Sequence, residues 1–125
     1  MDLNMKVLVV DDFATMRRIV KNILNQIGFK NIIEADDGSS ALEVLKKNKV
    51  DLIMSDWNMP KVTGLELLKA VRSDESMKDM PFLMVTAEGQ KDSVVQTVQA
   101  GVSDYIVKPF TADTVKEKLE KMFKK

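Results

Sequence analysis

The sequence predicts a doubly wound α/β domain, in which a five-stranded parallel sheet carries helices on both faces and forms three layers. Five short apolar segments alternate with five amphipathic segments along the chain, and this alternation is typical of repeated β-α units. The first apolar segment, VLVVD, is a continuous run, which indicates a strand buried on both faces. A length of 125 residues corresponds to one ordinary domain.

Each expected strand is a short apolar run that is rich in β-branched, aliphatic or aromatic residues. The runs are VLVVD at residues 7–11, IIEA at 32–35, VDLIMSD at 50–56, FLMVT at 82–86 and YIV at 105–107. The segments between these runs and after the last one have apolar residues at helical spacing. Helices are expected at residues 15–27, around Ala41, Leu42, Val44 and Leu45, at 65–72, at 92–100, and around Val115, Leu119 and Met122.

The ends of the expected helices carry local signals. Gly28 and Gly101 follow the first and fourth helices as stop signals. The dipeptide Asp37-Gly38 is a turn signal, and Ser40 and Glu43 have the spacing of a capping box for the second helix. These signals support the boundaries that the apolar spacing predicts.

The composition excludes several classes of function. Nineteen basic residues balance nineteen acidic ones, so the chain has no basic footprint for nucleic acid and no overall attraction to an anionic membrane. No apolar run is long enough to span a bilayer, and the N-terminus lacks the pattern of a signal peptide. The absence of cysteine suits the cytoplasm. The absence of histidine excludes a Ser-His-Asp triad and imidazole-bound zinc.

Polar residues gather where the expected strands end. Asp11 and Asp12 end the first strand, Asp56 the third and Thr86 the fourth, and Lys108 follows the fifth. In doubly wound sheets, ligands bind beyond the carboxyl ends of the strands, so these side chains are expected to converge. Taken singly, each has a structural interpretation. Asp11 or Asp12 is a potential helix cap, and Asp56 a potential turn residue.

Such a cluster has a definite chemistry. Closely packed carboxylates repel one another, and one lysine does not compensate three of them. Oxygen ligands without histidine or cysteine favour a hard divalent ion such as Mg²⁺. A carboxylate is also a nucleophile toward phosphorus, and phosphoryl transfer needs mainly positioning and charge neutralisation. Asp56, which ends the central strand, is therefore the expected acceptor.

At these residues the sequence resembles the receiver domains of two-component response regulators, and more narrowly the single-domain chemotaxis regulators of the CheY type. The stretches that carry the resemblance are DDFATMRRI, SDWNMP, MVTAE, QAG and YIVKPFT, in an order and spacing specific to the family. The resemblance covers residues 1–125 as one receiver domain with no separate output domain. It implies the flavodoxin-like strand order 2-1-3-4-5.

The resemblance also implies roles for individual residues in the chemistry. Asp56 corresponds to the phosphoacceptor, and Lys108 to the lysine that contacts the phosphoryl group. Asp11, Asp12 and Asp56 correspond to the carboxylates that hold Mg²⁺, with the backbone carbonyl of Asn58 as a further ligand. The family catalyses only its own phosphorylation and dephosphorylation, so the chain is not expected to be an enzyme.

Further roles implied by the resemblance concern signalling. Thr86 corresponds to the switch hydroxyl and Tyr105 to the aromatic residue that moves inward with it. Asn58 and Glu88 occupy the positions that tune self-dephosphorylation. The bond between Lys108 and Pro109 is expected to be cis. The residue before Tyr105 is an acidic one, where the best-known chemotaxis regulators tend to have a neutral residue.

The resemblance implies a histidine autokinase as phosphoryl donor and the flagellar motor switch protein as target, and a dedicated phosphatase is a possible third partner. The chain is expected to be a cytoplasmic monomer. The expected partner face lies on the last two helices and the strand between them. On the fourth helix, Val94 and Val98 are four residues apart and share one face, whereas Val95 points in another direction. One buried stripe does not need apolar residues in both directions, so some of these valines are expected to be exposed. With a basic rim, this face suits an acidic, hydrophobic peptide. Its expected members are Lys91, Val94, Val98, Tyr105, Lys118 and Lys121.

Three alternatives remain open at the level of sequence. The same chemistry is compatible with a stand-alone receiver in a phosphorelay outside chemotaxis. The stretch DDFAT loosely resembles the DxDxT signature of phosphohydrolases with an aspartyl nucleophile, although the second acid is one position early. A flavodoxin-like cofactor carrier is a third possibility, but the acidic Asp11-Asp12 loop would repel the phosphate of such a cofactor.

Overall fold

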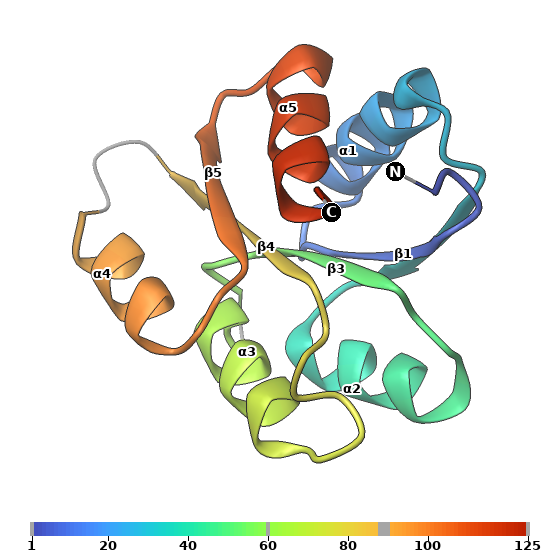
Figure 1. The fold of residues 1–125 in the computed structure, drawn as a ribbon. Coiled ribbons are helices and arrows are strands. Elements are labelled where there is room, and N and C mark those ends of the chain that lie inside the picture. Colours follow the sequence, from blue (N-terminus) through green and yellow to red (C-terminus); the bar gives the residue numbers. More distant parts are fainter. Residues whose placement is uncertain (1, 60, 88–90, 125) are drawn as a thin grey trace.

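The computed structural model describes residues 2–59, 61–87 and 91–124, within which strands and helices alternate strictly (Figure 1). The strands are β1 (Lys6–Val10), β2 (Asn31–Ala35), β3 (Leu52–Asp56), β4 (Phe82–Ala87) and β5 (Asp104–Lys108). The helices are α1 (Ala14–Ile27), α2 (Gly38–Lys47), α3 (Gly64–Ser73), α4 (Lys91–Gln99) and α5 (Ala112–Met122).

The five strands form one parallel sheet in the order β2-β1-β3-β4-β5. This confirms the predicted fold class and the order implied by the resemblance. The chain winds from β1 outward to β2, then returns across β1 to β3 and continues to β5. The winding therefore reverses at β1 and β3, where a doubly wound sheet has its binding crevice.

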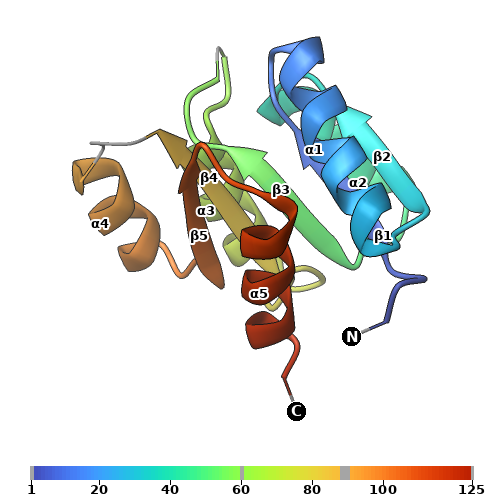
Figure 2. The ribbon, with the colours of Figure 1, turned by 90° about the horizontal axis from the view of Figure 1, so that it is seen from above.

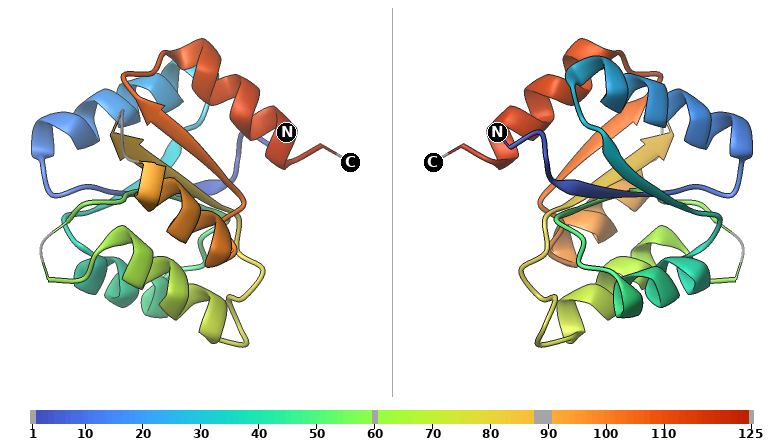
Figure 3. Two further views of the ribbon diagram at one scale, coloured as in Figure 1. Left: turned by 90° about the vertical axis from the view of Figure 1, so that its left-hand side faces the viewer. Right: turned by 90° about the vertical axis from the view of Figure 1, so that its right-hand side faces the viewer.

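The helices form two layers around the sheet, so the core is divided in two. Helices α1 and α5 cover one face, and α2 and α3 cover the other, with α4 beside β4 and β5 (Figures 2 and 3). The first core cluster joins alternate strand residues such as Val9 and Met54 to Leu24 of α1 and Leu119 of α5. The second cluster joins the intervening strand residues to the buried faces of α2 and α3. Burial on both faces explains the continuous apolar runs.

The predicted element boundaries agree with the structure to within about two residues, but the capping box of α2 was assigned to the wrong pair. Asp37, not Ser40, is the N-cap residue. The backbone N–H of Ser40 donates to Asp37 Oδ1 at 2.7 Å, and the Asp37 N–H donates to Ser40 Oγ at 3.1 Å. Glu43 is exposed and contacts Lys46. α2 therefore begins directly after Asp37 rather than after Ser40, because the Asp37 side chain accepts a backbone N–H of the first turn.

Arg72 of α3 joins three segments at the amino-terminal edge of the sheet. Its Nε donates to the carbonyl of Gly101 and its Nη1 to the carbonyl of Met80, both at 2.8 Å. Its Nη2 lies 3.5 Å from Ser103 Oγ. One guanidinium thus fixes the chain before β4 and the chain between α4 and β5.

We expect Arg72→Ala to lower the free energy of unfolding by about 2–3 kcal/mol, because hydrogen bonds from a charged donor contribute more than neutral ones. Arg72→Lys is the matched control. Lysine keeps the positive charge but lacks the planar guanidinium with its several donors. The Arg72→Lys variant should therefore lose less free energy of unfolding than Arg72→Ala, but should still be less stable than the wild type. Urea denaturation measures both, and an alanine variant that unfolds at the wild-type midpoint would contradict this role for the guanidinium.

Among the described residues, no helix has both the length and the apolar character that crossing a membrane requires.

Candidate functional site

Three of the predicted site residues lie on the same face of the sheet because strand side chains alternate. Asp56 follows the buried Met54 by two positions, and Lys108 likewise follows Ile106. Both point to the face that α1 and α5 cover, and Asp11 comes directly after the neighbouring strand β1. The carboxyl ends of parallel strands share one edge of the sheet, so these side chains meet there.

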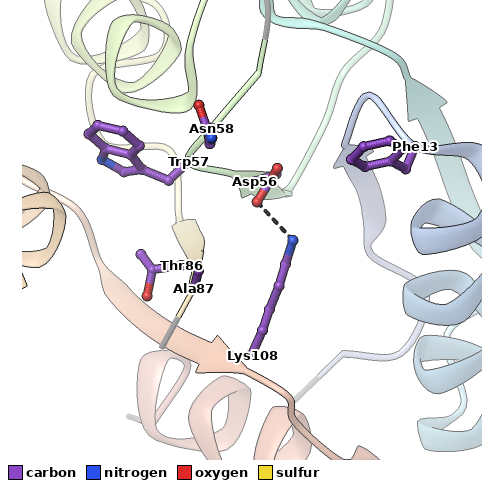
Figure 4. A pocket seen from close by; sticks show the side chains of 7 residues that line it. All are labelled: Phe13, Asp56, Trp57, Asn58, Thr86, Ala87 and Lys108. Atoms are coloured by element: carbon purple, nitrogen blue, oxygen red, sulfur yellow. Dashed lines mark hydrogen bonds and ion pairs between the residues drawn. The ribbon is translucent and has the colours of Figure 1, made fainter. Parts of the chain in front are cut away.

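Lys108 forms the ionic centre of the site. Its Nζ lies 3.0 Å from Asp56 Oδ1 (Figure 4) and 3.8 Å from Asp11 Oδ2. Asp56 is only 8% exposed and Asp11 only 3%, so this is a largely buried cluster rather than a surface ion pair. The bond between Lys108 and Pro109 is cis, as the resemblance implies.

The three carboxylates form a cluster suited to a cation. Asp11, Asp12 and Asp56 each offer an oxygen that lies within 4.8 Å of the others. Asp12 Oδ1 is buried, and no hydrogen-bond partner for it occurs in the described part of the chain. A buried carboxylate oxygen without a donor is costly, and a hard divalent ion such as Mg²⁺ would satisfy it. The donor set therefore fits Mg²⁺.

The electrostatics of the cluster lead to the same conclusion. Burial raises the pKa of Asp56 and of Asp11 above the ordinary range, and the charge of Asp12 acts in the same direction on both. Lys108 acts against this rise by its ion pairs, but burial outweighs it. One lysine therefore leaves the site short of positive charge, as expected from the sequence.

Neither acid of the Asp11-Asp12 pair is the N-cap residue of α1. That position is occupied by Phe13, which makes no side-chain cap. Asp11 Oδ1 instead accepts the backbone N–H of Phe13 at 2.9 Å, before the helix begins. The capping interpretation of these acids is therefore wrong, and their carboxylates face the site.

A hollow of about 200 Å³ opens above Asp56 (Figure 4). Trp57 contributes to its wall, and Thr86 Oγ1 is buried without a hydrogen-bond partner among the described residues. The small side chain of Ala87 also lines the hollow. The lining residues are Phe13, Asp56, Trp57, Asn58, Thr86, Ala87 and Lys108.

Phe13 is a site residue that the sequence interpretation missed. Its ring is 67% exposed although it lines the hollow. The available signal was an aromatic residue directly after the two acids, at a position where a helix usually starts with a small polar cap. Phe13 therefore presents an exposed apolar surface at the rim of the hollow.

Thr86 and Tyr105 lie on one face of adjacent strands. Tyr105 pairs with Met84, and Thr86 pairs with Val107, so Thr86 and Tyr105 are diagonal neighbours. Thr86 is buried and Tyr105 half-buried, and Tyr105 packs against the core cluster on the side of α2 and α3.

The expected partner face is partly revised by the structure. On α4, Val95 and Val98 are 54% and 56% exposed, whereas Val94 is half-buried. The exposed apolar pair is therefore Val95 and Val98, because the helix turns Val94 toward the protein. Lys121 is exposed, and Lys118 contacts β5. Glu88 and the side chain of Lys91 lie outside the described residues.

Comparison with known proteins places this site in a family. The response regulator receiver domain family matches the chain over residues 7–120. The chemotaxis protein CheY-3 of Vibrio cholerae is 57% identical over 122 residues, which cover 98% of this chain and 94% of that protein. The chemotaxis protein CheY of Pseudomonas aeruginosa is 55% identical over 121 residues, covering 97% and 98%.

Solved structures agree with this assignment. The chemotaxis response regulator CheY4 of Vibrio cholerae superposes with a TM-score of 0.87 at 36% identity, covering 96% of this chain and 99% of that one. A putative response regulator from Chloroflexus aurantiacus superposes with a TM-score of 0.90 at 29% identity, covering 95% and 97%. The chain therefore belongs to the response regulator receiver domain family, and it is similar over nearly its whole length to chemotaxis proteins of the CheY type.

Proposed function

We propose that this receiver accepts a phosphoryl group on Asp56, with Mg²⁺ bound, and signals by binding another protein in its phosphorylated form. The observation that carries the proposal is the buried Asp56 carboxylate, which is ion-paired to Lys108 beside two further acids below an open hollow. A carboxylate in this position is accessible to a phosphoryl donor, and its surroundings can compensate the charge of the phosphoryl group.

In the proposed step, a carboxylate oxygen of Asp56 forms a bond to the phosphorus of a phosphohistidine on a histidine autokinase. The bond from phosphorus to the imidazole nitrogen breaks, and that nitrogen keeps the electron pair and takes up a proton. Lys108, 3.0 Å from Asp56, is placed to neutralise a phosphoryl oxygen. Mg²⁺ held by Asp11, Asp12, Asp56 and the Asn58 carbonyl would supply further positive charge.

Hydrolysis of the bond between phosphorus and the Asp56 oxygen, which restores the free carboxylate, ends the proposed signal. Water attacks the aspartyl phosphate and releases phosphate, and we propose that Asn58 and Glu88 tune this rate, with or without a dedicated phosphatase. The position of Asn58 in the lining of the hollow above Asp56 supports this role.

The proposed output begins at Thr86. Its hydroxyl is buried without a hydrogen-bond partner among the described residues, so movement toward a phosphoryl oxygen on Asp56 would satisfy it. Tyr105 would then move inward beside Thr86 and reshape the face formed by α4, β5 and α5. This is a shift between two populated arrangements. The names of the relatives support a role in chemotaxis, and the family resemblance makes the flagellar motor switch the proposed target.

Intact mass spectrometry tests the acceptor directly. After incubation with acetyl phosphate and Mg²⁺, the protein should gain one phosphoryl group, and it should gain none when Mg²⁺ is chelated. The Asp56→Asn variant should gain none under either condition. A phosphoryl group that still appears on Asp56→Asn would refute the assignment of the acceptor. Steady turnover of a phosphate ester such as p-nitrophenyl phosphate would favour the enzymatic alternative.

A receiver in a phosphorelay outside chemotaxis is the second candidate function, and the acceptor chemistry is the same in both. Titration with a peptide from a flagellar motor switch protein separates them. Tighter binding to the phosphorylated form than to the unmodified form supports chemotaxis, whereas equal affinity for the two forms would contradict a motor-switch output.

A further inference from the structure

Lys118 of α5 makes two contacts with β5 at once. Its Nζ lies 3.3 Å from Asp104 Oδ1 and 5.2 Å from the centre of the Tyr105 ring. The same oxygen, Asp104 Oδ1, accepts the backbone N–H of Tyr105 at 2.8 Å. The carboxylate, the ammonium group and the aromatic ring therefore form one connected group.

These contacts cross the open edge of the sheet. β5 is an edge strand, and its side chains alternate between the two faces. Ile106 packs with the α5 residues Val115 and Leu119, whereas Tyr105 packs against the core cluster on the opposite face. α5 packs on the first face of the sheet, so the side chain of Lys118 must reach past the edge of β5 to lie over the Tyr105 ring.

We propose that Lys118 is a latch that holds the Tyr105 ring at the edge of β5 and thereby opposes its inward movement. The inference rests on the proposed function, because it assumes that Tyr105 moves when Asp56 is modified. An ammonium group over the ring face is attracted to the π-electrons, and a ring that moves toward Thr86 leaves this contact. Asp104 keeps the ammonium group in place, because the two form an ion pair.

The latch has a small but measurable strength. A cation–π contact at a partly exposed site favours the conformation that contains it by about two- to fivefold. Since binding of a phosphoryl analogue is coupled to the inward conformation of Tyr105, removal of the latch should tighten that binding by the same factor. The latch thus sets how far the unmodified protein is biased against its signalling conformation.

The test compares Lys118→Met with three other variants. Methionine keeps an apolar stem without the charge, Lys118→Arg keeps a cation that can stack on the ring, and Asp104→Asn weakens the ion pair while keeping an oxygen for the Tyr105 N–H. Lys116→Met removes an exposed charge from the same helix, at a position outside the expected partner face, and serves as the matched control. Beryllofluoride with Mg²⁺ is the phosphoryl analogue, and Trp57 fluorescence reports its binding.

Lys118→Met and Asp104→Asn should bind beryllofluoride about two- to fivefold more tightly than the wild type, whereas Lys118→Arg and Lys116→Met should match it. Tyr105 is the single tyrosine of the chain, so selective labelling gives one ring signal in NMR spectra. Lys118→Met should shift this signal in the unmodified protein. Wild-type affinity in Lys118→Met, or an unshifted ring signal, would overturn the latch. A wild type that binds no beryllofluoride would instead refute the proposed function, and the ring signal would still test the contact.

Discussion

Gly64→Ala is expected to destabilise the protein by about 3 kcal/mol or more, at the upper end of the usual cost of overpacking. Gly64 is the first residue of α3, and its N–H donates to the carbonyl of Trp57 at 2.9 Å. A Cβ atom at this position would collide with the carbonyl oxygen of Asp56 and lie 2.9 Å from the Cα of Trp57. These neighbours are backbone atoms at the end of a buried strand, so they have little freedom to move.

The sign of the effect makes this prediction specific. On helix propensity alone, alanine should be more stable than glycine by about 0.5–1 kcal/mol. Gly101→Ala is the matched control, because its nearest neighbour is a side-chain atom of Arg72 at 3.7 Å, and its cost comes from a φ of +87°. We expect that control to lose only about 1–2 kcal/mol. Urea denaturation compares the variants, and a Gly64→Ala protein as stable as the wild type would show that the helix can move away from Asp56.

The close approach of Gly64 also links the fold to the chemistry. Displacement of the first turn of α3 would move the backbone of Asp56, and with it the carboxylate that Lys108 holds at 3.0 Å. The Gly64→Ala variant should therefore incorporate phosphoryl groups more slowly from acetyl phosphate, even under conditions in which it is fully folded.

The convergence of the site could be predicted from the sequence because it follows from topology. Asp56 and Lys108 end strands, and Asp11 follows one, so a parallel sheet must bring them to one edge. The strand order, by contrast, came from the resemblance, since the spacing of β-α units is the same for several orders. The Asp12 carboxylate was expected at the cluster, but only the structure shows that one of its oxygens is buried without a hydrogen-bond partner in the described part of the chain.

Contacts between distant elements were the part that sequence analysis missed. The bonds from Arg72 to Gly101 and Met80 join segments with no local pattern in common. The contact of Lys118 with Tyr105 depends on the position of α5 relative to a sheet edge, which no periodicity specifies. The capping box of α2 failed for a different reason, since two overlapping pairs had suitable spacing and the earlier aspartate formed the cap.

Asp12→Asn is expected to have opposite effects with and without metal. Without Mg²⁺ at pH 7, the variant should be more stable than the wild type by about 1–2 kcal/mol, because one of three carboxylates with oxygens within 4.8 Å loses its charge in a partly screened site. With Mg²⁺ at one hundred times its Kd for the wild type, the wild type gains about 2.7 kcal/mol. The variant should gain much less, because it has lost an anionic ligand.

The pH dependence gives this prediction a second readout. Burial raises the folded-state pKa of Asp11 and Asp56 above the ordinary value of 3.8, and the charge of Asp12 adds to the rise. Between 3.8 and the raised values, the folded protein binds more protons than the unfolded chain, so the metal-free protein loses stability as the pH rises through this range. Asp12→Asn should flatten that loss, since both pKa values then lie closer to 3.8.

Thermal and urea unfolding between pH 4 and pH 8, with Mg²⁺ and with a chelator, measures these effects together. Glu117→Gln removes one negative charge at an exposed position on α5 and controls for the change in net charge. Its stability should follow the wild type under every condition, because its charge is far more screened than a charge in the cluster. If Asp12→Asn lost stability without metal and kept the full response to Mg²⁺, the three acids would not form a cation site, since repulsion and ligation must disappear together when one carboxylate is neutralised.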